Sequence, residues 1–120
     1  MSETNTTRMI IEAGKIDRKA RLQVAVTSKV FKDFTDTPLT AVGAIIYEKA
    51  DKETGELKEY TAIITKEEGA ITGNSSVIND EISDLIAMGV FDDNGEFNFT
   101  ITLKKTNGNS GREFATIEIL

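Results

Sequence analysis

The chain has 120 residues, 39% of them hydrophobic, and contains neither cysteine nor histidine. A domain of this length buries enough apolar surface to fold without disulfides or metals. The missing residue types exclude thiolate catalysis, thiolate zinc sites and histidine-based acid–base chemistry. The formal net charge is −6, but residues 1–32 carry +4, residues 33–99 carry −11 and residues 100–120 carry +1.

The uneven charge gives one conditional expectation. If the two basic ends lie side by side in the fold, an acidic protein could still present a basic face to polyanions. No segment approaches the roughly 20 apolar residues of a membrane span. We therefore expect a cytoplasmic, single-domain protein over residues 1–120, with a flexible segment at residues 1–6.

The first third of the chain contains one strand and one ambiguous segment. Residues 7–13 form a short apolar run that fits a first strand. In residues 17–26, Asp17 is a possible helix cap, but Leu22, Val24 and Val26 alternate as in a strand. We favour a short helix or an irregular segment there.

The middle of the chain predicts a hairpin and then a helix. Residues 39–49 and 55–66 are strand-like and are joined by a short polar turn. Residues 70–72 allow a brief strand. From about residue 76 to residue 88 the apolar residues recur at three- and four-residue spacing, after a serine placed to cap a helix.

The C-terminal part predicts a second long hairpin, in which two alternating stretches are joined by TNGNS at residues 106–110. The predicted fold is mainly β within the α+β class. We expect a small antiparallel β-barrel of about five strands, similar to an oligonucleotide-binding (OB) fold, with one well-defined helix at about 76–88.

Alternation places an unusual pair of side chains on the solvated face of this hairpin. Phe97, Phe99, Ile101 and Leu103 share the apolar face of its first strand. In its second strand, Phe114 and Arg112 fall on the face opposite Ala115, Ile117 and Ile119, because side chains alternate with period two. Lys104 and Lys105 lie beside them at the turn. Cations and an exposed ring are the combination that single-stranded nucleic acid binders use.

A bulge in the turn would overturn this assignment. A one-residue shift in TNGNSGRE would point Phe114 inward and reverse the faces of the last strand.

The stretches ITGNSSVINDEISDLIAM, FNFTITLKK and GREFATIEI, in this order, resemble the single-stranded DNA-binding replication proteins of phages and mobile elements of Gram-positive bacteria. The resemblance covers residues 39–120, and its most recognisable pieces are TGNS at 72–75 and GREF at 111–114. It implies a small acidic protein, often built on an OB barrel, without enzymatic activity or cofactor. It finds no counterpart for residues 1–38.

On this hypothesis each candidate residue has a physical role. Arg112, Lys104 and Lys105 would neutralise phosphates, and Phe114 would stack on bases, with Tyr47 or Tyr60 as further rings that are more often core. Four N-terminal cations would extend the path of the strand: Lys15, Arg18, Lys19 and Arg21. Binding would be salt-sensitive with little sequence preference. RNA is not excluded, and exposed strand edges make a homodimer plausible.

Two other function classes compete with this hypothesis. An enzyme would have to use carboxylates alone, and the sets Asp80, Glu81, Asp84 and Asp92, Asp93 are typical of a solvated helix face and of a turn, so we expect neither a catalytic nor a metal site. A protein-binding module is the stronger rival. The acidic stretch 33–99 could imitate nucleic acid towards a host protein, as an inhibitor or DNA mimic.

Overall fold

A computed structural model describes residues 7–105 and 112–120. The flexible segment expected at 1–6 and the turn of the second hairpin at 106–111 lie outside the described residues. The described residues form six strands and two α-helices. In chain order these are β1 (Thr7–Gly14), α1 (Arg18–Val26), β2 (Leu39–Ala50), β3 (Leu57–Thr65), β4 (Gly69–Gly73), α2 (Ser76–Ala87), β5 (Phe97–Lys105) and β6 (Glu113–Ile119).

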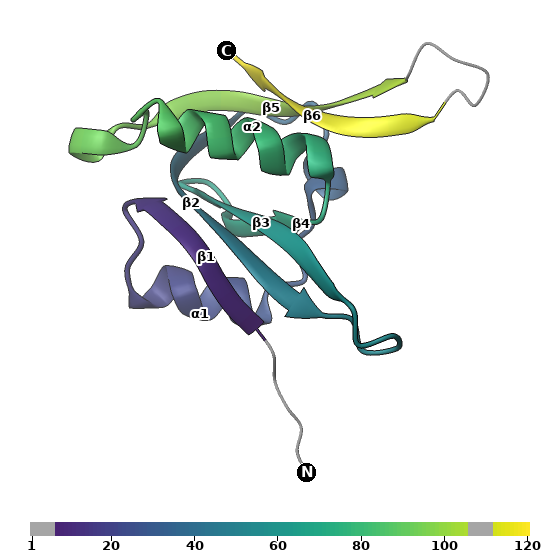
Figure 1. Cartoon of the computed structure of the whole chain (residues 1–120). Helices are drawn as coiled ribbons and strands as arrows, with labels where there is room; N and C mark the ends of the chain where they lie inside the picture. Colours follow the sequence, from purple (N-terminus) through teal and green to yellow (C-terminus); the bar gives the residue numbers. More distant parts are fainter. Residues whose placement is uncertain (1–6, 106–111) are drawn as a thin grey trace.

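The six strands form one sheet that bends around the long strand β2 (Figure 1). The order of the sheet is β4-β3-β2-β5-β6, and β1 also pairs with β2. The start of β2, residues 39–41, pairs with β5, and residues 43–49 pair with β1. All these pairings are antiparallel. Strands β1 and β5 therefore share one edge of β2. The sheet divides into one arm formed by β5 and β6 and another formed by β1, β2 and β3.

The main core lies between α2 and the concave side of the sheet. Ile78 and Ile82 of α2 are fully buried, and they belong to the same apolar cluster as Ile63, Phe99 and Ile101. The Ser75 hydroxyl caps this helix by accepting a hydrogen bond from the Ile78 N–H at 3.2 Å. The predicted helix and its serine cap are confirmed, because an apolar stripe at helical spacing has only one way to face a sheet.

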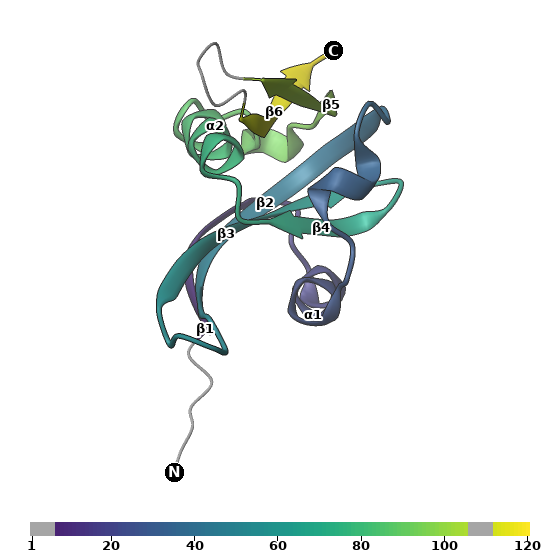
Figure 2. The same ribbon diagram turned by 90° about the vertical axis from the view of Figure 1, so that its right-hand side faces the viewer.

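Helix α1 covers the opposite face of the sheet (Figure 2). Its buried Ala20 packs with Ile64 and Ala70, and its half-buried Val24 packs against the cluster around Ile45. The Asp17 carboxylate accepts a hydrogen bond from the Ala20 N–H at 2.8 Å. Of the two interpretations of residues 17–26, the helix is therefore correct, because both the cap and the sheet face that needs covering favour it.

The expectation of a small β-barrel of about five strands with one well-defined helix is corrected on three points. The sheet has six strands, since β4 is a full strand where only a brief one was expected, and α1 is a second helix. The sheet does not close, because no ladder joins β4 to β6 in the described parts of the chain. Lys29 and Val30 instead lie along the outer edge of β4. The Thr72 N–H donates a hydrogen bond to the Lys29 carbonyl at 3.0 Å, and Val30 forms a parallel bridge with Thr72.

The outer edge of β6 is also occupied. The Glu81 carboxylate of α2 accepts hydrogen bonds from the Ile117 N–H at 2.9 Å and from the Thr116 hydroxyl at 2.6 Å. Both ends of the sheet thus have local partners, which removes the need for β4 and β6 to pair.

The two basic ends of the chain do not lie side by side. The start of β1 and the end of β6 are at opposite ends of the molecule (Figure 1). Neither described helix is long and apolar enough to cross a bilayer.

Candidate nucleic-acid interface

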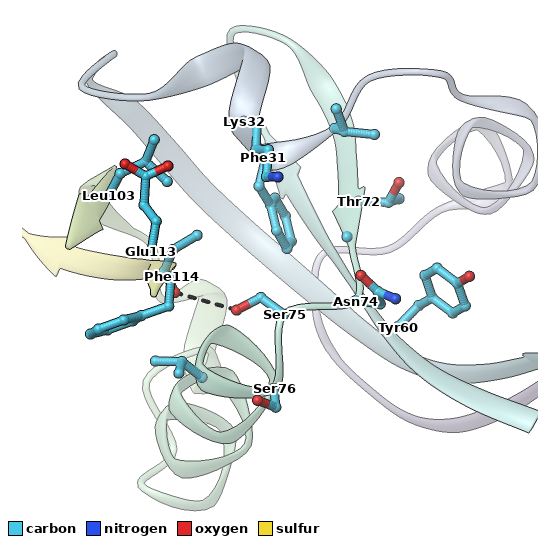
Figure 3. Close-up of a pocket in the computed structure, with 14 residues that line it drawn as sticks. Phe31, Lys32, Tyr60, Thr72, Asn74, Ser75, Ser76, Leu103, Glu113 and Phe114 are labelled. Atoms are coloured by element: carbon cyan, nitrogen blue, oxygen red, sulfur yellow. Dashed lines mark hydrogen bonds between the residues drawn. The ribbon is translucent and has the colours of Figure 1, made fainter. Parts of the chain in front are cut away.

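A cleft of about 610 Å³ lies where the sheet fails to close. It is bounded by the last residues of β4, the first residues of β6, the start of α2 and the segment before β2 (Figure 3). Its walls include Phe31, Tyr60, Asn74, Ser75, Leu103 and Phe114. The cleft is therefore assembled from segments that are distant in the sequence.

Phe31 and Gly73 form part of the wall of this cleft and touch each other. Phe31 is 3% exposed and begins a 3₁₀ turn, Phe31–Phe34. A Cβ on Gly73 would lie 2.5 Å from the Phe31 ring, so only glycine allows the ring to approach β4 this closely. Sequence reasoning missed Phe31, because residues 27–38 showed no strand or helix period. The only available signal was the FKDF spacing, which places two aromatic residues one helical turn apart.

Phe114 lies on the opposite wall. It pairs with Lys104 across the hairpin, in a register that runs without a shift from Phe99↔Ile119 to Lys105↔Glu113. The bulge that would have turned the ring into the main core is therefore absent from the described ladder. Phe114 is half-buried, and its ring lies on the α2 side of the cleft (Figure 3).

Three cations lie at the turn end of this hairpin. Lys104 and Lys105 end β5, Arg112 precedes β6, and all three are exposed. None of them forms an ion pair with another described residue. Their charges are therefore open to solvent and to a ligand.

Tyr60 of β3 is among the residues that line the cleft, but it lies at the opposite end of the cleft from Phe114 (Figure 3). Its ring stacks on that of Tyr47, with centroids 5.6 Å apart and planes 17° from parallel. Tyr47 is 8% exposed, and burial, followed by the nearby Tyr60 hydroxyl, raises its pKa. The rings of both tyrosines pack with the cluster of Ile45 and Ala62 on the α1 side of the sheet, so neither ring lies beside Phe114.

The start of α2 connects the cleft to β6. The Ser75 hydroxyl, which caps the helix, also donates a hydrogen bond to the Ala115 carbonyl at 3.3 Å (Figure 3). Residues 72–75 therefore do two things: they end β4 at the cleft and attach the first turn of α2 to the strand that carries Phe114.

The N-terminal cations are not part of this site. Lys15 precedes α1, and Arg18, Lys19 and Arg21 lie on α1, which covers the other face of the sheet from α2 (Figure 2). Arg21 forms an ion pair with Glu12 at 2.7 Å. The ten predicted residues thus divide into a hairpin group and an α1 group, and the tyrosine pair lies on the α1 side of the sheet.

The structure also shows where the carboxylates considered as catalytic candidates lie. Glu81 is engaged with β6, whereas Asp80, Asp84, Asp92 and Asp93 are exposed. Among the described residues, no group of three or more acidic side chains is arranged to hold a metal ion.

Comparison of the chain with protein-family models, with curated proteins and with solved structures gives no match. Its function is therefore inferred from the geometry and chemistry of the cleft.

Proposed function

We propose that this protein binds single-stranded DNA with little sequence preference, without catalysis and without a cofactor. The biological setting we propose is phage-type replication or recombination in the cytoplasm. The observation that carries the proposal is a cleft lined by Phe114 beside three exposed cations, Lys104, Lys105 and Arg112, that form no ion pair with a described residue.

The chemistry of the cleft suits bases, and the chemistry of its rim suits phosphates. Ring faces stack on any base, at roughly 1–3 kcal/mol per base, and this contact does not read sequence. Cations at the turn end of the hairpin neutralise phosphates of the DNA backbone, which releases counterions. We therefore propose that the DNA backbone runs along the turn end of the hairpin and that its bases point into the cleft.

The order of the elements supports an OB-like assignment as part of this proposal. Strands β2, β3 and β4 are followed by α2 and then by β5 and β6, and β2 pairs with both β3 and β5. OB folds are partly open five-stranded barrels that bind oligonucleotides on the face of their second and third strands and with two adjacent loops. In this chain the corresponding strands are β3 and β4, which contribute Tyr60 and Gly73 to the cleft.

The test is a fluorescence titration with a labelled oligo-thymidine at two salt concentrations. We expect binding that weakens steeply with salt and is reduced by Arg112→Ala and by Phe114→Leu. The leucine variant preserves apolar bulk beside α2 but removes the stacking ring. Circular dichroism before each titration establishes that the variants are folded.

Lys66→Ala is the matched control. Lys66 is exposed and forms an ion pair with Glu96 at 2.7 Å, at the far end of β3 from Tyr60. The substitution removes one positive charge but leaves the cleft intact, so affinity should change little. Absence of binding at low salt would overturn the proposal.

A protein-binding role is the second candidate, and one observation favours it. Residues 67–103 contain eight acidic residues and no lysine or arginine. Asp80 and Asp84 are exposed on the outer face of α2. If the titration fails, this acidic face becomes the better candidate for contact with a basic nucleic-acid-binding protein of the host.

A further inference from the structure

The outer face of α1 combines two cations with two exposed apolar side chains. Successive residues of a helix are about 100° apart, and Ala20 and Val24 face the sheet. The opposite side therefore presents Arg18, Lys19, Leu22 and Val26, which are all exposed. Leu22 is 50% exposed and Val26 is 81% exposed. We call these four residues the α1 face.

The outer face of α2 has the opposite charge and a similar apolar end. Ile78 and Ile82 face the core. The opposite side of the helix presents Asp80, Asp84, Ala87 and the C-cap residue Met88, all exposed, with Met88 at 80%. We call these four residues the α2 face.

The charges on both faces are available for an external contact. Arg18, Lys19, Asp80 and Asp84 form no ion pair with any described residue. Their opposite signs make the two faces electrostatically complementary, which speeds encounter and selects orientation.

The two faces also have the same length. Residues 18, 22 and 26 run charge, apolar, apolar along α1, and residues 80, 84 and 88 run charge, charge, apolar along α2. Each series covers nine residues, or about 12 Å of helix. Two such helices packed in parallel would place Arg18 and Lys19 against Asp80 and Asp84. The same packing would bury Val26 against Ala87 and Met88, and Leu22 would lie level with Asp84.

A single molecule cannot make this contact with itself, because α1 and α2 cover opposite faces of the sheet (Figure 2). We propose that the α1 face of one copy packs on the α2 face of the next. The contact is heterologous, so each copy keeps one face free and the assembly grows as a chain instead of closing as a symmetric dimer. One helix pair is a small interface, so the association is weak and reversible. The proposal does not depend on nucleic acid.

Sedimentation velocity over a range of protein concentrations tests this association. We expect the average mass of the wild type to rise with concentration at about 0.05 M salt and to fall at about 0.5 M salt. Arg18→Glu with Lys19→Glu, and Asp80→Lys with Asp84→Lys, should each be monomeric alone. An equimolar mixture of the two charge-reversed variants should associate again, because each reversed face then meets a complementary one.

Two further variants separate the apolar and charged contributions. Met88→Ser should weaken association without changing its salt dependence. Lys52→Glu reverses a charge on the exposed β2–β3 turn and should leave association unchanged. Removal of a single ion pair, as in Lys19→Ala, should lower the association constant by about threefold.

Three outcomes would overturn the proposal. The first is a wild type that stays monomeric at every concentration at low salt. The second is an α2-face variant that associates as well as the wild type, which would indicate a symmetric contact such as pairing through β1. The third is a mixture that fails to restore association although both variants retain their circular dichroism spectra. Each outcome is independent of oligonucleotide binding, so failure here leaves the proposed function standing.

Discussion

Gly73 of β4 lies directly against the ring of Phe31, so closely that a Cβ would come within 2.5 Å of Cδ2. We expect Gly73→Ala to lower the free energy of unfolding by about 1–3 kcal/mol, because the ring must leave a packed position. Urea unfolding measures this change. Phe31→Ala removes the atoms that the new Cβ would meet, so in that background Gly73→Ala should lower the free energy of unfolding much less than in the wild type. Equal costs in both backgrounds would contradict the contact.

Glu81 holds the outer edge of β6 by accepting hydrogen bonds from Thr116 and Ile117. Glu81→Ala should destabilise the fold by about 1–3 kcal/mol, since it leaves a partly buried N–H without its partner. It should also speed hydrogen exchange at the Ile117 amide. Asp84→Ala, one turn further along the exposed side of α2, is the control and should change neither quantity by a comparable amount.

Glu67 gives the fold an acid-sensitive contact. Its carboxylate accepts hydrogen bonds from the Thr40 N–H at 2.7 Å and from the Thr40 hydroxyl at 2.8 Å. The bond from the Thr40 amide, the largest cause, lowers the pKa of Glu67 below its ordinary value. A lowered pKa in the folded state means that the unfolded chain takes up the proton first. The stabilisation is therefore complete above about pH 5 and is lost as the pH falls through the folded-state pKa.

The measurement is the difference in unfolding free energy between the wild type and Glu67→Gln as a function of pH. The difference should shrink in acid, because the glutamine does not titrate. In a Thr40→Ala background the variation of this difference with pH should be smaller but still present, since the Thr40 position keeps its amide donor. A difference that is constant with pH would rule out this contribution.

Tyr47 makes the stability of the fold depend on pH in the opposite direction, and this effect appears at alkaline pH. Burial and the neighbouring Tyr60 raise its pKa. Its contribution to stability is therefore complete below the pKa of an unfolded tyrosine and is lost as the pH rises through the folded-state pKa. Spectrophotometric titration of the wild type and of Tyr47→Phe should differ by one group that ionises later than an ordinary tyrosine. The phenylalanine variant should also lose less stability in alkali.

The separation of the two basic groups predicts different salt dependences for oligonucleotide binding. In Lys104→Ala with Lys105→Ala, the slope of log affinity against log salt should become shallower by about 0.7 for each phosphate that is no longer neutralised. Arg18→Ala with Lys19→Ala removes the same charge from α1, which covers the other face of the sheet from α2, and should leave the slope nearly unchanged. Equal effects of the two double variants would mean that the bound strand reaches both faces.

Much of the secondary structure could be predicted from the sequence, since its signals are local. The alternation of Phe97, Phe99 and Ile101 identified the buried face of β5, and the stripe through Ile78 and Ile82 identified α2. The register of β5 with β6 also agrees with alternation, which places Phe114 opposite Lys104. These patterns depend on side-chain periodicity, which a strand or helix keeps whatever it packs against.

The candidate site was predicted only in part. Phe114 and the cations near it could be located by counting along one hairpin. Phe31 could not, because its position depends on a contact with Gly73, 42 residues away. The α1 cations were expected on the same path, but their helix covers the other face of the sheet from α2, which charge alone does not show.

The sequence by itself determined the strands, the capped helix α2 and the side of the last hairpin on which Phe114 lies. The tertiary structure alone decided that the sheet stays open, that a cleft forms at the opening, and that α1 and α2 lie on opposite faces. The physical reason is that closure and burial depend on competition between distant partners. The Lys29 carbonyl accepts a hydrogen bond from the outer edge of β4, and the Glu81 carboxylate accepts one from the outer edge of β6. The backbone groups at these two edges therefore have partners without pairing of β4 with β6.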